Sequence, residues 1–303
     1  MKMRAVVKSL LGMLKDTLTE WWNDNTFRLA ASLAFYTIFS LAPILLIAVG
    51  FVSLIFSQER ASDEVVRQVK ALAGVQGATA ARQVLGSVKQ IGGNPMAILI
   101  GFATLVVGST AVFAELQSAL NLIWDVTADP SRNKIKGLIR DRLLSFAIVL
   151  AVGFLLLVSL LISAAIAALH TYLAGKMPGM SNFWQMLNMV TSFGITALLF
   201  AMIYKYLPDV KITWRDVWVG ALVTALLFTG GKLLIGMYLG QMVGGNVYGA
   251  AGSFVVLLIW VYYSALICFF GAEFTQVYAR RYGSKIRPQE HAIRLGKKQD
   301  QSR

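Results

Sequence analysis

Six stretches of this sequence contain no Asp, Glu, Lys or Arg, and they constrain the fold more than any other feature. They are Leu29–Gln58, Gln90–Ala114, Leu143–Gly175, Met177–Tyr204, Val217–Gly231 and Leu233–Ala272. A helix needs about 20 apolar residues to cross the hydrocarbon core of a bilayer. Each of the first four stretches is long enough for one crossing. A soluble protein with a core of buried helices would not need six stretches of this kind.

Only Lys232 separates the last two stretches, and the glycine-rich segment Gln241–Gly252 divides them with a composition typical of a turn. We therefore predict two crossings there and an all-α membrane protein with six transmembrane helices. The predicted crossings are Leu29–Phe56, Pro95–Leu116, Leu143–Leu169, Trp184–Tyr206, Val217–Gly240 and Ser253–Tyr278. Membrane β-strands are excluded, because they are about 10 residues long and alternate in polarity.

Composition and charge agree with a membrane protein. Hydrophobic residues make up 57% of the chain and charged residues 14%, and the net charge is +13. The cations are scattered among loops and a tail instead of being interleaved with stacking aromatic residues. We therefore expect membrane lipids as partners and no nucleic acid. One cysteine excludes an intrachain disulfide framework, and two histidines, to which we assign no role, leave little for a metal; no cofactor is expected.

The distribution of Lys and Arg predicts the orientation, because these residues favour the cytoplasmic side. With both termini inside, the cytoplasmic segments carry 21 of them and the external segments 6. Residues 1–28 then form a cytoplasmic segment, residues 29–279 the six-helix domain and residues 280–303 a basic cytoplasmic tail. We expect that tail to be polar and mobile.

Two segments outside the crossings have helical periodicity. Residues Val6–Trp22 place leucines and tryptophans on one face, which indicates a helix lying in the membrane interface; a helix packed on cytoplasmic loops is the alternative. Residues 59–93 form an external insertion with Val and Leu at helical intervals on both sides of Gly74 and Gly77. We predict two short amphipathic helices that cover the outer face, the first capped by Ser62.

The sequence contains no recognised catalytic constellation. Gly231-Lys232 resembles the end of a phosphate-binding loop, but Leu233 replaces the required Ser or Thr. There is neither a nucleophile elbow nor the ligand spacing of a zinc site. We therefore predict that the protein is not an enzyme.

Polar and ionisable groups in or near the crossings are the candidate functional residues, because each is costly in lipid. Lys232 should face protein or water, and polar packing and contact with an anionic substrate are equally open for it. Glu115 and Glu273 should lie near the cytoplasmic boundary, where ordinary solvation or pairing with a cation such as Arg280 is the alternative. The candidates for a polar cavity or substrate site are Lys232, Glu115, Asn121, Glu273, Asn188 and Ser40.

Backbone chemistry singles out three further positions. Pro43 lies near the middle of the first crossing and removes one helical hydrogen bond, which predicts a kink, either static or acting as a hinge. Thr37 and Ser40 are placed to bond freed carbonyl groups. Gly236 and Gly240 have the spacing of small residues that let two membrane helices pack closely.

Three blocks of the sequence are distinctive: Ala30–Pro43, Leu207–Lys232 and Tyr248–Ala279. On these blocks, and over nearly all of Leu29–Ala279, the chain resembles the YihY/virulence factor BrkB family of bacterial inner-membrane proteins. The resemblance implies six transmembrane helices in the bacterial cytoplasmic membrane and a link to envelope integrity, with envelope-lipid transport suggested. The family also carries an older ribonuclease label, which no metal site or acid–base cluster in this sequence supports. No catalytic residue can be carried over.

Together these features lead us to expect that the protein transports or handles an amphipathic, lipid-like envelope substrate, with envelope transport proteins as further partners. A carrier or channel for a small solute or ion is one alternative, which a narrow polar path between the helices would favour. A scaffold that transports nothing is the other, which a dry interior would favour. Substrate, energy source and oligomeric state are left open.

Overall fold

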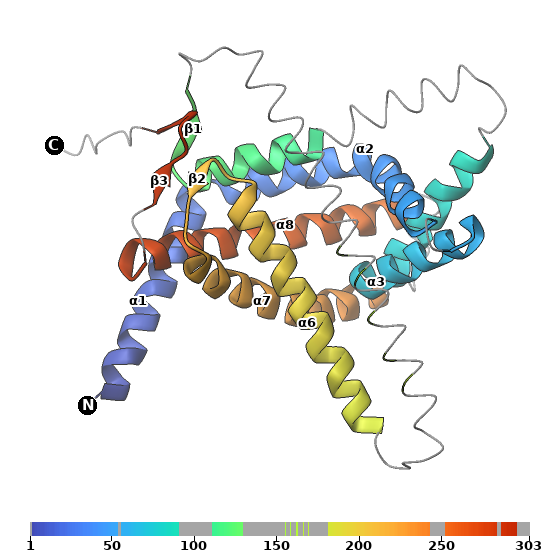
Figure 1. Cartoon of the computed structure of the whole chain (residues 1–303), viewed down its shortest axis with the longest axis horizontal. Coiled ribbons are helices and arrows are strands. Elements are labelled where there is room, and N and C mark those ends of the chain that lie inside the picture. Colours follow the sequence, from blue (N-terminus) through green and yellow to red (C-terminus); the bar gives the residue numbers. More distant parts are fainter. Residues whose placement is uncertain are drawn as a thin grey trace.

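The computed structural model describes residues 2–53, 56–90, 111–129, 181–242, 252–283 and 286–295, together with five single residues between 155 and 169. Almost all of this is helical (Figure 1). The predicted second and third crossings, Pro95–Leu116 and Leu143–Leu169, fall largely outside the described residues. The total of six crossings and the orientation therefore stay predictions.

Among the described residues, three helices are long and apolar enough to cross a membrane. They are α6 (Ser181–Tyr206), α7 (Trp214–Met242) and α8 (Gly252–Arg281), and they contain the whole of the fourth, fifth and sixth predicted crossings. Helix α8 is central, because it packs against α1, α2, α3 and α7 (Figure 1). A shorter apolar helix, Ala111–Ile123, precedes the first strand.

The first predicted crossing is helix α2 (Thr26–Val52), which follows α1 (Lys2–Asn23) after a sharp turn. Asn25 makes the turn with a left-handed backbone, φ 53°, a conformation that Asn tolerates better than most residues. The Thr26 hydroxyl donates to the Trp21 carbonyl at 2.6 Å, which holds the start of α2 against the end of α1. The two helices therefore meet in a fixed corner.

The predicted backbone features can be tested only in part. Helix α2 continues through Pro43, whose side chain lies outside the described residues, so the kink stays a prediction. Ser40 donates to the Tyr36 carbonyl at 3.0 Å and Thr37 to the Leu33 carbonyl at 2.7 Å, each one turn back along the helix. Gly236 and Gly240 lie in α7, but their packing contacts fall outside the description and that prediction is also untested.

Helix α1 lies along the C-terminal part of α8. Met13 is buried against Phe274 and Val277, and Arg281 pairs with Asp16. The helix is thus packed on α8, and not on cytoplasmic loops as the alternative interpretation has it. Its leucine-rich stripe nevertheless stays exposed and free to lie on a membrane surface; the members of that stripe are Leu11, Leu14, Leu18 and Trp22.

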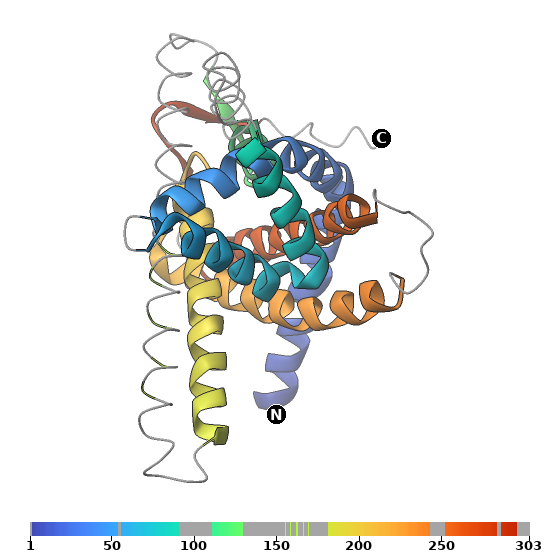
Figure 2. The same cartoon turned by 90° about the vertical axis from the view of Figure 1, so that its right-hand side faces the viewer.

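Helix α3 (Gln58–Gln90) is continuous, so the prediction of two separate helices is wrong. Ala61 and Leu85, from its two halves, nevertheless join one cluster with Leu45–Val52 of α2. Along a straight helix Ala61 and Leu85 would be roughly 36 Å apart, whereas Leu45–Val52 span only about 10 Å. The helix must bend, as Figure 2 shows, and the two predicted glycine breakpoints lie between its halves.

Helix α3 also begins earlier than predicted. Its first residue is Gln58, and Ser62 lies inside the first turns. The Ser62 hydroxyl donates to the Gln58 carbonyl at 3.0 Å, as a serine in a helix interior does, so its predicted role as a cap is wrong. An acidic residue, Glu59, occupies the first turn and favours helix initiation there.

Two short antiparallel sheets tie the C-terminal segment to the loops of the bundle. Strand β1 (Val126–Ala128) pairs with β4 (Ala292–Arg294), and β2 (Val210–Lys211) pairs with β3 (Arg287–Pro288). The prediction of a mobile tail is therefore wrong for residues 286–295. Backbone groups of the loops and of the tail satisfy one another, a pairing that hydropathy does not reveal.

The main core forms where α6, α7 and α8 meet. Tyr204 is fully buried there, and its hydroxyl donates to the Cys268 carbonyl at 2.7 Å and lies 2.9 Å from the Thr224 hydroxyl. Gly271 makes this approach feasible, because a Cβ on it would overlap the hydroxyl groups of Thr224 and Tyr204. The backbone of α8 is thus in direct contact here with side chains of α6 and α7.

Candidate functional site

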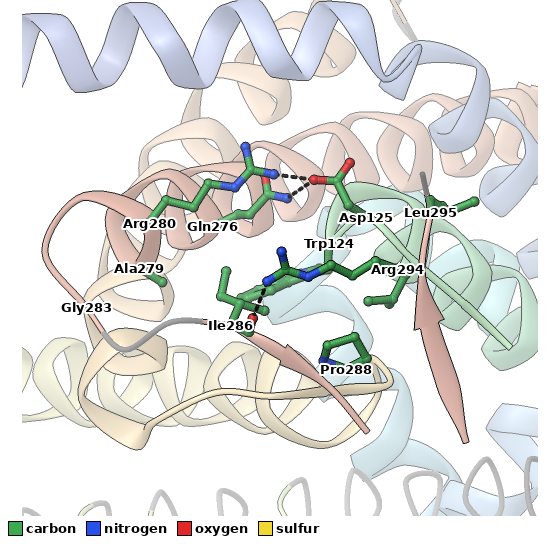
Figure 3. Close-up of a pocket in the computed structure, with 11 residues that line it drawn as sticks. Trp124, Asp125, Gln276, Ala279, Arg280, Gly283, Ile286, Pro288, Arg294 and Leu295 are labelled. Atoms are coloured by element: carbon green, nitrogen blue, oxygen red, sulfur yellow. Dashed lines mark hydrogen bonds and ion pairs between the residues drawn. The ribbon is translucent and has the colours of Figure 1, made fainter. Parts of the chain in front are cut away.

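A pocket of about 750 Å³ opens between the end of helix Ala111–Ile123, the C-terminal part of α8 and the small strands (Figure 3). Its volume is in the range of about 300–1,000 Å³ that is typical of small-molecule sites. The apolar lining is Trp124, Val126, Ala279, Ile286, Pro288 and Leu295, with Gly283 beside them. The polar lining is Asp125, Gln276, Arg280 and Arg294. The site therefore combines an apolar wall with a few convergent polar groups.

Asp125 is positioned by the end of the helix that precedes it. Its backbone is left-handed, φ 54°, and its N–H donates to the Leu122 carbonyl at 3.0 Å, which terminates helix Ala111–Ile123. The carboxylate then faces α8, where it accepts hydrogen bonds from Gln276 Nε2 at 3.3 Å and from Arg280 (Figure 3). This local stop thus turns a helix end into one side of the pocket.

Two guanidinium groups supply the positive charge of the pocket. Arg280 pairs with Asp125 and lies 3.7 Å from a carboxylate oxygen of Glu20. Arg294 donates to the Ile286 carbonyl at 2.8 Å (Figure 3). A guanidinium has five N–H donors, and these contacts engage fewer than half of those available. Two cations against one lining carboxylate leave the pocket with a net positive charge and with donors for an anion.

Asp209 is a buried hub next to strand β2. Its carboxylate accepts hydrogen bonds from Asn121 Nδ2 at 2.9 Å, His291 Nε2 at 2.8 Å and Gln117 Nε2 at 3.4 Å. Its backbone N–H donates to Asn121 Oδ1 at 2.8 Å. One carboxylate therefore joins helix Ala111–Ile123, the loop after α6 and the turn between β3 and β4, which follows the pocket residue Pro288 of β3.

Glu273 lies on α8 under the corner between α1 and α2. It is fully buried, and neither carboxylate oxygen has a hydrogen-bond partner among the described residues. The charged side chains close to it are Asp24, Glu20 and Arg280. Burial excludes ordinary solvation, one of the alternatives for this residue. Arg280 therefore lies between the pocket and three acids, of which Glu273 is buried and Glu20 and Asp24 are half-buried.

The other predicted candidates do not line the pocket. Lys232 is half-buried on α7, and Glu115 is half-buried on helix Ala111–Ile123. Asn188 is exposed on α6, so the described residues form no closed cavity around it. Ser40 is buried and bonded within its own helix. Of the six candidates, the structure brings Asn121 and Glu273 to the pocket end of the bundle.

Sequence reasoning missed most of the residues that build this end. Asp125 and Asp209 each follow a helix, a position where an acid is usually solvated, and His291 and Arg294 lie in a segment expected to be mobile. The available signal was Pro208-Asp209 in one of the three distinctive blocks. Their partners are distant in sequence, so periodicity could not find them.

Comparison with known proteins identifies the family of this chain. The model of the family described as Virulence factor BrkB matches residues 17–295. This chain belongs to that family. The resemblance inferred from the three sequence blocks is thus confirmed, and the match extends into the segment that carries Arg294.

Relatives of this BrkB-family protein are named as membrane proteins. The UPF0761 membrane protein of Verminephrobacter eiseniae is 28% identical over 282 residues, which cover 89% of this chain and 64% of the relative. The UPF0761 membrane protein of Delftia acidovorans is 27% identical over 264 residues, 86% of this chain and 60% of the relative. That of Yersinia pestis is 32% identical over 182 residues, 58% of each chain.

These comparisons agree with the apolar helices, and the protein is an integral membrane protein. The chain spans about three-fifths of the length of the first two relatives. No solved structure matches it.

Proposed function

We propose that this BrkB-family protein transports or handles an anionic, amphipathic lipid of the bacterial envelope, and that the pocket binds the lipid headgroup. The observation that carries the proposal is the lining of the pocket, in which Arg280 and Arg294 stand beside an apolar wall. Arg binds phosphate and carboxylate groups through paired N–H donors. The apolar wall suits the part of a lipid that joins the headgroup to its chains.

The position of the pocket supports a lipid more than a soluble ligand. Arg280 is in the last turn of α8, a helix long enough to span the membrane, so the pocket lies where that helix leaves the hydrocarbon region. With the cytoplasmic orientation that the Lys and Arg distribution predicts, this is the inner face of the cytoplasmic membrane. Anionic headgroups are concentrated at that depth, where each basic residue contributes about 1 kcal/mol to binding.

The proposed role requires binding and movement but no bond-breaking step. A small-solute carrier would use the same arginines but would gain nothing from the apolar wall. A scaffold would need no ligand at all. Lipid-chain dependence of binding therefore separates the three functions.

The test uses the full chain in nanodiscs, with native mass spectrometry to compare retention of phosphatidylglycerol and of phosphatidylcholine. The wild type should retain the anionic lipid preferentially. The double variant Arg280→Gln/Arg294→Gln should lose roughly tenfold or more of that preference, because hydrogen bonds to charged groups contribute about 1.5–3 kcal/mol each. The matched control Arg281→Gln/Arg287→Gln removes the same charge from neighbouring residues that do not line the pocket.

Equal losses in the two double variants would overturn the proposed pocket, because net charge alone would then explain the preference. Binding of free glycerol phosphate as tightly as the lipid would favour the small-solute carrier. No preference for either lipid in the wild type would contradict the proposed function and favour the scaffold.

A further inference from the structure

Glu273 is the most unusual ionisable group of the described chain. Its side chain is fully buried in α8, and neither of its oxygens has a hydrogen-bond donor in the part of the chain that the structure describes. Phe270, one turn before Glu273 on α8, has its ring 6.2 Å from that of Trp21 of α1, which in turn lies 4.6 Å from the ring of Phe27 of α2. A buried polar group without a partner is destabilising by about 1–3 kcal/mol, and more if it is charged. A group of this kind suggests a function beyond packing.

The charged groups around Glu273 are mostly acids. Asp24 comes from the corner between α1 and α2, Glu20 from the last turn of α1, and Arg280 from two turns further along α8. Helix α2 carries one charged residue, Arg28, which is exposed, and Asp216 at the start of α7 accepts a hydrogen bond from Thr213 at 2.8 Å. Three carboxyl groups thus share one nearby guanidinium, and Arg280 also serves Asp125.

We propose that Glu273 and Asp24 form a proton-binding carboxyl pair, and that Arg280 couples this pair to the headgroup pocket. Two carboxyl groups held close together share a proton, because both are not ionised together when one of them is buried. The proton is the cation that suits the site: among the residues that the structure describes, no three His, Cys, Asp or Glu side chains are arranged to hold a metal ion.

The sign of the coupling follows from the position of Arg280. Its guanidinium contacts Glu20 on the acid side and Asp125 on the pocket side. An anionic headgroup draws this positive charge toward the pocket and leaves the acids less well neutralised, so the pair takes up a proton more readily. By reciprocity, protonation of the pair strengthens headgroup binding. The protein would then bind its substrate more tightly as the pH falls.

The proton site itself can be tested without any lipid ligand. Infrared spectroscopy of the full chain in nanodiscs of phosphatidylcholine, titrated with acid, should show a C=O stretching band from protonated carboxyl groups. Glu273→Gln should remove one titrating carboxyl per chain, and Asp24→Asn should change the same part of the band. Glu59→Gln, at an exposed acid of α3, serves as the control and should lack that effect on the buried component. Spectra of Glu273→Gln and wild type that titrate identically would overturn the pair.

The coupling rests on the proposed function and has its own readout. Phosphatidylglycerol binding to the wild type should tighten by up to ~10-fold per unit fall in pH within the range where the pair titrates, the limit for one linked proton. Glu273→Gln should still bind the lipid but lose this dependence. Retention of the pH dependence in that variant would overturn the coupling. If the wild type binds no phosphatidylglycerol but its carboxyl band still titrates as expected, the proposed function and the coupling are contradicted. The proton-binding pair is then still supported.

Discussion

Two regions of the molecule are held in opposite ways. The polar end, defined by Asp125, Asp209, Gln276, Arg280 and His291, is joined by hydrogen bonds between residues 82 to 155 positions apart. The outer half of α6, Phe183–Val190, extends away from α7 and α8 (Figures 1 and 2). Trp184 is buried there, but four other large apolar side chains are exposed; they are Phe183, Met186, Met189 and Val190.

The difference shows which solvent each region is built for. In water, an exposed run of large apolar residues would favour aggregation, whereas in lipid it is already solvated. Conversely, the carboxylates and guanidinium groups of the polar end need one another or water. The bundle is therefore anchored at one end by specific bonds and left free in the bilayer at the other. A binding site that requires fixed geometry belongs at the anchored end.

Replacing Asp209 by Ala should have the largest effect on stability, because Asp209 is the hub of the polar end. It would leave Asn121, Gln117 and His291 with buried donors that have lost their acceptor, and we expect a loss of roughly 3–5 kcal/mol in stability. Thermal unfolding of the detergent-solubilised protein measures this. The control Asp63→Ala removes an exposed acid of α3 and should change stability by less than about 0.5 kcal/mol. Similar unfolding temperatures for the two variants would show that the hub does not anchor the bundle.

A charge on the outer half of α6 should come second. Met189 is 63% exposed, and if that face meets lipid, Met189→Arg should hinder insertion by about 2.5–3.5 kcal/mol. Ile293→Arg places the same side chain at an exposed apolar position of β4, at the polar end, where water is available and the effect should be small. The amount of each variant recovered in the membrane fraction checks this. Normal insertion of Met189→Arg would mean that this face of α6 is in contact with water or protein.

The same contrast explains what the sequence could predict. Helices α6, α7 and α8 follow from long charge-free stretches, because a membrane helix is specified by local composition. The polar end depends on contacts such as Asn121 with Asp209, 88 residues apart, and on strands of two or three residues. Nothing in periodicity indicates those. Asn121 and Glu273, which the sequence singles out because a polar group close to an apolar stretch needs a local reason, lie at this end, and their role in a substrate site stays a prediction.

Adding one methyl group to the packed core tests the comparison most finely. A Cβ on Gly271 would overlap the hydroxyl groups of Thr224 and Tyr204, so Gly271→Ala should force α7 and α8 apart and lower stability by about 1–3 kcal/mol. Gly194→Ala makes the same change on α6, where nothing lies within 4 Å of the added carbon. It should be neutral or slightly stabilising, because Ala favours a helix over Gly. Thermal unfolding of the two variants side by side distinguishes packing from helix propensity. Equal changes in unfolding temperature would mean that a small movement of α7 accommodates the added carbon, and that α7 and α8 are packed less tightly than the buried hydroxyl groups indicate.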